Sequence, residues 1–195
     1  MSALSESLGM SLMGSSTIPA VLAARMAKGV ETGEKIVELV QKGVTTRDIL
    51  TEDAFENAVM HLLTMGGSTN GILHLQAIYH EAGLGELPLS VFDEFSRRIP
   101  QVASIYPASE FDMVDFYEGG GVPAVLKEIE GFLHKDTLTV SGLTMGEALS
   151  RFSYTNNRNM IKTAEEPFAP TGGVAILKGN IAPLGCVIKP AAVPK

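Results

Sequence analysis

Apolar residues recur at intervals of three and four along the first two thirds of the chain, which is the spacing of one helical face. The clearest example follows Thr51, where Phe55, Val59 and Leu62 form such a stripe. Acidic residues directly after Thr51 favour a helix start there, because they complement the positive end of the helix dipole. We therefore expect helices over residues 2–9, 17–26, 34–41, 51–63, 70–83, 90–98, 121–129 and 144–149.

Four segments of the chain have the features of strands, three of them in its last third. Residues 137–141 alternate between apolar and polar types, and residues 101–106 resemble a short buried strand. Two further apolar stretches, 173–178 and 186–189, are separated by a turn rich in glycine and proline and predict a hairpin. Because two strands alone are marginally stable in water, we expect more sheet than this chain supplies. The sequence is thus expected to be a piece of a longer protein.

Composition and charge narrow the class of protein. The chain has 195 residues, of which 45% are hydrophobic and 19% charged, and its net charge is −7 without any run of lysine or arginine. Nucleic acid is therefore not an expected partner, since such binding depends on cationic contacts to phosphates. No apolar run approaches the length of a membrane helix, and residues 1–6 lack the features of a signal peptide. We expect a soluble, cytoplasmic protein without a membrane partner.

Residues 66–70, Gly-Gly-Ser-Thr-Asn, form the most informative polar segment. Two glycines allow a sharp turn, and Ser68, Thr69 and Asn70 are all good helix N-cap residues. A helix that begins here directs its first N–H groups and its positive dipole end toward solvent, where they bind an anion. The alternative interpretation is an ordinary connection between two helices.

The histidines and carboxylates do not form a recognisable catalytic pattern. His74 and His80 are six residues apart, which places them on different faces of a helix, so they are not a metal-binding pair. His61 lies among apolar residues and is interpreted as a packed or surface residue. The acidic residues that follow Thr51 are assigned to the first turn of their helix, and Glu165 and Glu166 to a solvated segment. We predict no catalytic and no metal-ligating residue from the residues themselves.

Three other features remain as weaker candidates. The single cysteine, Cys186, excludes an internal disulfide and a cysteine-built metal site, and its apolar surroundings predict a small buried side chain. Gly119–Gly121 precede a helix and are able to hold a phosphate, but the segment lacks the lysine of a Walker motif. Lys178 lies at the end of a strand and is expected to be solvated.

Five segments, taken together, resemble one enzyme family. They are Glu-Ser-Leu-Gly-Met-Ser-Leu at 6–12, Ala-Phe-Glu-Asn-Ala at 54–58, Gly-Gly-Ser-Thr-Asn-Gly-Ile-Leu-His-Leu at 66–75, Gly-Gly-Val-Pro-Ala-Val at 120–125, and Gly-Val-Ala-Ile-Leu-Lys-Gly-Asn-Ile-Ala-Pro-Leu-Gly at 173–185. In this order they resemble the dihydroxy-acid dehydratase family, which also contains phosphogluconate dehydratase and the sugar-acid dehydratases. Met1 resembles the methionine that closes the Thr-Ala-Asn-Thr-Met segment of the family, so the chain is expected to begin inside its parent.

The resemblance implies a hydro-lyase that converts a 2,3-dihydroxy acid into a 2-keto acid. In the family, an iron–sulfur cluster and a magnesium ion act as Lewis acids and a serine alkoxide removes the C2 proton. The Cys-Asp-Lys segment, the cysteine before the counterpart of Met1 and the Thr-Asp-Gly-Arg-x-Ser segment have no counterparts here. The resemblance therefore transfers no catalytic or metal-binding residue, and we expect this chain to bind no cofactor by itself and to be inactive alone. Ser68, Thr69 and Asn70 are expected to line the substrate cleft of the parent enzyme.

The resulting prediction is an α/β fold in two incomplete parts. Residues 1–152 would be the latter part of a helix-rich N-terminal α/β domain, 153–170 a linker, and 171–195 the first strands of a C-terminal domain that resembles a β-barrel. The function expected of the parent is that of dihydroxy-acid dehydratase in branched-chain amino-acid biosynthesis, acting on a small hydroxy acid as a homo-oligomer. The alternatives are a fragment of a sugar-acid or phosphogluconate dehydratase, or a non-catalytic helical binding or assembly module.

Overall fold

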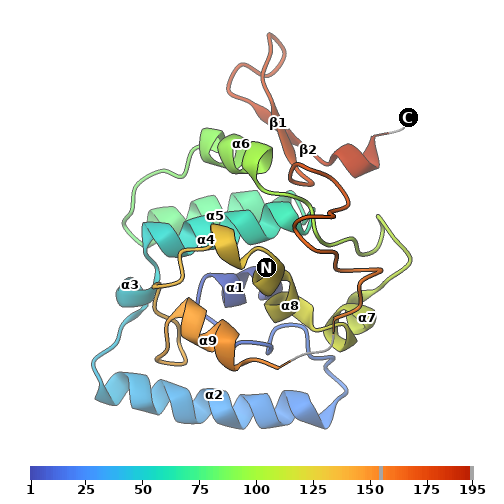
Figure 1. The fold of residues 1–195 in the computed structure, drawn as a ribbon. Coiled ribbons are helices and arrows are strands. Elements are labelled where there is room, and N and C mark those ends of the chain that lie inside the picture. Colours follow the sequence, from blue (N-terminus) through green and yellow to red (C-terminus); the bar gives the residue numbers. More distant parts are fainter. Residues whose placement is uncertain (154–155, 194–195) are drawn as a thin grey trace.

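Helix α4, Glu52–Thr64, lies at the centre of the molecule and is buried along most of its length. The computed structural model describes residues 1–153 and 156–193 (Figure 1). The Thr51 hydroxyl accepts a hydrogen bond from the Ala54 N–H and so caps α4 as predicted. Helices α1, α5, α6 and α8 pack around α4.

The remaining elements follow in chain order. The helices are α1 (Ser2–Ser7), α2 (Ala23–Gln41), α3 (Thr46–Ile49), α5 (Asn70–Glu81), α6 (Leu89–Arg98), α7 (Met113–Glu118), α8 (Gly121–Glu128) and α9 (Met145–Arg151), with short 3₁₀ turns at Glu130–Phe132 and Pro190–Ala192. Strands β1 (Ala175–Leu177) and β2 (Cys186–Ile188) form an antiparallel hairpin. None of the helices in the described part of the chain has both the length and the apolar content that a membrane crossing requires.

One hydrophobic core connects the helices with the start of the hairpin. Phe55 of α4 meets Tyr79 of α5 in an edge-to-face contact, with ring centroids 4.9 Å apart. The largest fully buried side chains include Phe55, Phe92, Phe116, Met60, Leu63, Ile72, Leu75, Ile99, Leu126, Ile129, Met145 and Leu149. Strand β1 packs against α6, where the Ser96 hydroxyl donates a hydrogen bond to the Val174 carbonyl. The helical part and the first strand of the hairpin are therefore joined by the same core.

Two of the predicted strands are wrong. Residues 101–106 make only isolated antiparallel bridges, between Gln101 and Ala169 and between Ala103 and Ile161. Residues 137–141 contribute a single bridge from Leu138 to Thr144. Both segments are extended and partly buried, but neither has a continuous partner strand, so no ladder of hydrogen bonds develops. The hairpin formed by β1 and β2 is confirmed, and it is the only paired sheet among the described residues.

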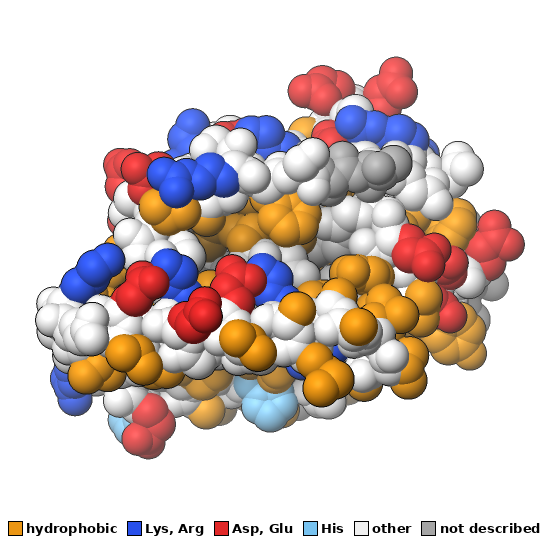
Figure 2. All heavy atoms as spheres, turned by 90° about the horizontal axis from the view of Figure 1, so that it is seen from below, with side chains coloured by type: hydrophobic (Ala, Val, Ile, Leu, Met, Phe, Trp, Pro, Cys, Tyr) orange, Lys and Arg blue, Asp and Glu red, His pale blue; other side chains and the backbone are white. Residues whose placement is uncertain are grey.

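Helix α2 differs most from its prediction. Two stretches, 17–26 and 34–41, were expected, whereas one helix runs from Ala23 to Gln41 through Gly29 and Gly33. Only Leu39 of this helix is buried, and its apolar side faces away from the body (Figure 2). The exposed apolar side chains are Leu22 (40%), Met26 (79%), Val30 (65%), Ile36 (55%), Val37 (55%) and Val40 (70%). We call this surface, from Leu22 to Val40, the α2 face.

Candidate functional site

The Gly-Gly-Ser-Thr-Asn segment turns the chain sharply between α4 and α5, as predicted. Gly66 has a positive φ of 55°, which glycine adopts without strain. Gly67 lies directly against α4, because a Cβ atom added there would be 2.6 Å from Leu62 Cδ1. The N–H groups of both glycines bond to carbonyls at the end of α4. A side chain at Gly67 would therefore have to displace the end of the Leu62 side chain, and the turn holds the start of α5 close to α4.

More of the first N–H groups of α5 have hydrogen-bond partners within the turn than the sequence predicts. Thr69 occupies the N-cap position, and its side chain makes no capping hydrogen bond. Instead, the Ser68 hydroxyl accepts a hydrogen bond from the Asn70 N–H at 3.3 Å, and the Ser68 carbonyl accepts one from Gly71. The Ile72 N–H bonds to the Thr69 carbonyl. Three of the first N–H groups of α5 thus already have partners, which leaves the side chains of Ser68 and Asn70 as the main polar groups at this turn.

Ser68 and Asn70 line a cavity of about 390 Å³ between α1, α4 and α5. His74, one turn further along α5, also lines it, whereas Thr69 does not. The other lining residues are Met1, Ser2, Ala3, Leu4, Leu62, Met65, Gly67, Gly71, Ile105 and Met113. The cavity therefore combines mostly apolar walls with a few polar groups, which is the usual make-up of a small-molecule site. We call it the Ser68 cavity.

His61 is buried in α4 and does not line this cavity. The Ser7 hydroxyl donates to the Leu4 carbonyl, so its oxygen accepts a hydrogen bond from His61 Nδ1, 3.0 Å away. The other ring nitrogen, Nε2, has no hydrogen-bond partner among the described residues. Burial, assisted by the positive charge of the chain's N-terminus, lowers the pKa of His61 to about 3. His61 is thus a neutral, packed residue, and of the two interpretations from the sequence, packed or at the surface, the first is confirmed.

Glu6 is a second buried titratable group, and the residue pattern did not single it out. Its carboxylate accepts hydrogen bonds from the N–H groups of Gly14 and Ser16 and so fixes the loop after α1. Burial raises the pKa of Glu6, and these hydrogen bonds oppose that shift in part. A lone carboxylate in a short helix, followed by a loop that contains glycine and serine, is the signal that would have indicated this role.

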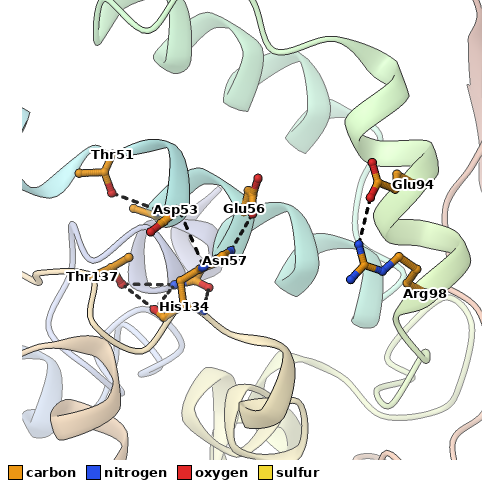
Figure 3. Close-up of polar contacts among 9 residues, drawn as sticks. Thr51, Asp53, Glu56, Asn57, Glu94, Arg98, His134 and Thr137 are labelled. Atoms are coloured by element: carbon orange, nitrogen blue, oxygen red, sulfur yellow. Dashed lines mark hydrogen bonds and ion pairs between the residues drawn. The ribbon is translucent and has the colours of Figure 1, made fainter.

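Asp53, Glu56 and His134 bring together ligand types that bind metals (Figure 3). His134 Nε2 bonds to Glu56 Oε2 at 2.6 Å, while Nδ1 lies 3.8 Å from Asp53 Oδ1. The two carboxylates thus approach different nitrogens of one ring, although one ligand atom of each of the three residues lies within 4.8 Å of the others. Magnesium, however, prefers an octahedron of oxygen ligands. The trio does not fit the magnesium ion that the resemblance implies; it attaches His134 to α4.

The residues of this chain do not fit an iron–sulfur cluster either. Such clusters are held by several thiolates, whereas Cys186 is the only cysteine of the chain. It is exposed on β2, so the prediction of a buried side chain is wrong. The burial was inferred from apolar neighbours, but the hairpin projects from the body and leaves that side of the strand uncovered (Figure 1). Lys178, Glu165 and Glu166 are exposed as predicted.

Asn57 makes the polar connection that sequence reasoning missed. It is fully buried on α4, and its amide nitrogen donates to the His134 carbonyl at 3.0 Å and to Thr137 Oγ1 at 3.3 Å. Its amide oxygen accepts the His134 N–H at 2.9 Å. These contacts join residues about eighty positions apart in the sequence, and Figure 3 shows them beside the separate Glu94–Arg98 ion pair of α6. In the sequence, the only signal of this role is that Asn57 is a polar residue among apolar residues of a predicted helix.

Comparison with known proteins identifies related chains. The N-terminal model of the dihydroxy-acid/6-phosphogluconate dehydratases matches residues 1–148, and the corresponding C-terminal model matches residues 159–195. Proteins named dihydroxy-acid dehydratase from Ignicoccus hospitalis and from Caldanaerobacter subterraneus are each 47% identical over 99% of this chain. The corresponding protein of Metallosphaera sedula is 44% identical over 98% of this chain. The chain spans 35% of the length of each of these relatives.

Proposed function

Because the chain belongs to the dihydroxy-acid/6-phosphogluconate dehydratase family, we propose that it is part of a hydro-lyase that converts a 2,3-dihydroxy acid into a 2-keto acid. The observation that carries this proposal is 44–47% identity, over almost the whole chain, to relatives named dihydroxy-acid dehydratase. These names favour a dihydroxy-acid substrate over a sugar acid or phosphogluconate. Such identity in both the helical part and the hairpin also speaks against an unrelated helical binding module.

The role proposed for this chain is to bind and orient the substrate. Ser68 and Asn70 place a hydroxyl and an amide beside an otherwise largely apolar cavity, where they bind the carboxylate or a hydroxyl of a small acid. The aliphatic part of the substrate would contact the apolar wall that includes Leu4, Leu62 and Met65. Thr69 belongs to the same proposed site through its carbonyl, which accepts the Ile72 N–H and so fixes the first turn of α5, because Thr69 does not line the cavity.

Replacing Ser68 with alanine in the full-length enzyme tests this role. We expect the KM for the dihydroxy acid to rise about tenfold, because one hydrogen bond to a charged group is lost. Ser90→Ala is the matched control, since Ser90 is an exposed serine of α6 outside the cavity. Steady-state kinetics of both variants give the comparison. Unchanged KM and kcat in the Ser68 variant would remove Ser68 from the substrate site.

The division of the chain into two parts belongs to the same proposal. Residues 1–152 would form part of one domain and residues 171–195 the start of a second, β-barrel-like domain, joined by residues 153–170. Separate family models for the two regions support this division. The hairpin of β1 and β2 supports it as well, because each strand has only one partner strand among the described residues, which leaves its other edge for further pairing. Residues 154–155 of the proposed linker lie outside the described residues.

A homo-oligomer is the assembly we propose, and the α2 face supports it. Gly29 and Gly33 lie on this face with no atom within 4 Å of an added Cβ. Glycine inside a helix costs about 1 kcal/mol relative to alanine, and no contact within the described chain requires it here. The absent side chains instead leave room for the close approach of a second helix. A second copy of the chain would bring an identical apolar stripe and an identical glycine pair to this contact.

A charge on the α2 face is expected to weaken self-association. Val30→Glu would introduce a carboxylate into the apolar contact without disturbing the core, because Val30 is 65% exposed. Leu73→Glu is the control, since Leu73 is 65% exposed on α5, away from this face. Sedimentation velocity should show a higher dissociation constant for the Val30 variant only. Equal association of both variants and the unaltered chain would exclude the α2 face as the contact.

A further inference from the structure

Two carboxylates lie side by side near the start of α4. Asp53 and Glu56 are three residues apart, and side chains at this spacing are neighbours on a helix surface. Among the ion pairs of the described residues, none joins either carboxylate to a lysine or an arginine. Their basic neighbour is His134, which carries a charge only when it is protonated. In the described part of the chain, the two carboxylates therefore have no permanently charged cation paired with them.

The backbone of His134 is attached to α4 independently of its ring. The Asn57 amide binds both the N–H and the carbonyl of His134, at 2.9 and 3.0 Å, and Asn57 is fully buried. This attachment holds the imidazole beside the carboxylates, although 78 positions separate His134 from Glu56 in the sequence (Figure 3). A ligand set that is already assembled loses less conformational entropy when it binds. The long separation is also the reason that the sequence pattern did not predict a metal site here.

The distances within this group are close to those of a zinc site. One ligand atom from each of Asp53, Glu56 and His134 lies within 4.8 Å of the other two. In a tetrahedral zinc site, two ligand atoms are about 3.4 Å apart, so these atoms need to approach by about 1.4 Å at most. The side chains of Asp53, Glu56 and His134 are 62%, 37% and 37% exposed. They therefore have room at the surface for the small rotations that this requires.

The types of ligand determine the class of ion. Zinc accepts histidine nitrogen together with carboxylate oxygen, whereas magnesium and calcium prefer oxygen alone. Two carboxylates balance the two positive charges of the ion, and the imidazole binds in its neutral form. Three protein ligands also leave the fourth position of a tetrahedral ion to water. The group thus fits zinc better than either alkaline-earth ion.

We propose that Asp53, Glu56 and His134 form a binding site for a zinc ion. The ion would bind one oxygen of each carboxylate and one ring nitrogen, and would connect the segment around His134 to the start of α4. Because the unfolded chain does not bring these residues together, zinc would stabilise the folded chain. None of the three residues lines the Ser68 cavity. The site therefore does not depend on the reaction proposed for the family.

Calorimetric titration of the 195-residue chain with zinc chloride tests the site. Cys186→Ser serves as the background, because the exposed thiol of Cys186 is itself a zinc ligand. In this background we expect saturable binding of one zinc ion, and at least tenfold weaker binding of magnesium. His134→Gln and Glu56→Gln should each weaken zinc binding at least tenfold, since each removes one ligand. His80→Gln is the matched control and should bind zinc unchanged, because His80 is an exposed histidine of α5.

Urea unfolding with and without zinc provides a second readout. Zinc should raise the urea midpoint of the Cys186→Ser chain and of its His80→Gln variant, and should leave that of the His134→Gln variant unchanged. Absence of saturable zinc binding to the Cys186→Ser chain would overturn the proposal, whether or not the other variants fold. Magnesium binding as tight as zinc binding would overturn it as well. So would zinc binding that survives in full in both His134→Gln and Glu56→Gln, because the ion would then lie elsewhere.

Discussion

Replacing Asn57 with alanine is expected to lower the free energy of unfolding by about 3 kcal/mol, since it removes three hydrogen bonds and leaves a small cavity. Asn57 is fully buried, so water does not replace the lost partners at its position. The hydroxyl of Thr137, which is also buried, would keep only its bond to the His134 carbonyl. The segment 134–137 would therefore keep only the contact of His134 with Glu56 as its close polar attachment to α4, and we expect the whole domain to unfold at lower urea concentration.

Urea unfolding followed by circular dichroism measures this effect. Asn159→Ala is the matched control, because Asn159 is exposed and its change should alter stability by less than about 0.5 kcal/mol. Asn57→Asp adds a second comparison: it keeps an acceptor for the His134 N–H but places a carboxylate against the His134 carbonyl. We expect the aspartate to be at least as destabilising as alanine at neutral pH. A loss below about 1 kcal/mol for Asn57→Ala would show that these hydrogen bonds contribute little.

Stability is expected to fall when the pH is lowered from 6.5 toward 3, and His61 is the main cause in this range. Burial lowers the pKa of His61 from 6.5 to about 3 in the folded chain. Between these values the unfolded chain binds a proton that the folded chain does not bind, so acid favours unfolding. The stabilising effect is complete above pH 6.5 and declines by up to about 1.4 kcal/mol per pH unit below it.

Glu6 acts in the opposite direction. Burial raises its pKa above 4.5, so the folded chain binds this proton at a higher pH than the unfolded chain does. Protonation of Glu6 therefore adds stability as the pH falls through its raised pKa toward 4.5. The net dependence on pH is smaller than that of His61 alone wherever the two ranges overlap. The single variants His61→Gln and Glu6→Gln separate the two contributions.

Urea unfolding at pH 7, 6, 5 and 4.5 provides the measurement. His61→Gln is expected to flatten the decline below pH 6.5, because glutamine can still bond to Ser7 but does not titrate. His80→Gln removes an exposed imidazole at the end of α5 and serves as the matched control. Glu6→Gln is expected to make the decline steeper. If His61→Gln retained the full pH dependence, the titrating group would have to be sought elsewhere.

The helices were predictable because their apolar spacing and their caps are local features. Thr51 and Thr144 cap α4 and α9 as their positions indicate, and the turn at Gly66 and Gly67 occurs where two glycines allow it. Helix α2 was predicted as two stretches, 17–26 and 34–41, with Gly29 and Gly33 between them. In the structure both are interior positions of one helix, which continues because backbone hydrogen bonds on either side of the glycines outweigh their low propensity.

The candidate sites were only partly predictable. Ser68, Thr69 and Asn70 were found from their type and spacing, and the structure places the first and last of them at a cavity. Gly119–Gly121 appeared weak in the sequence because the segment lacks a lysine. Gly121 lies against Thr17, which is about one hundred residues away in the sequence and meets it only after folding. Asn57 and His134 likewise acquire their roles from each other across 77 positions, whereas Glu6 binds a loop only eight to ten residues further along the chain.

The sequence by itself determined the helix-rich first part, the hairpin and the family, because periodicity, caps and ordered motifs are all written along the chain. Only the tertiary structure decided which polar groups are buried, which of them meet, and which apolar faces remain open. The α2 face and the exposed Cys186 are the clearest examples of what only the tertiary structure decides. An apolar pattern states that a side chain favours burial, whereas actual burial depends on whether another element covers it.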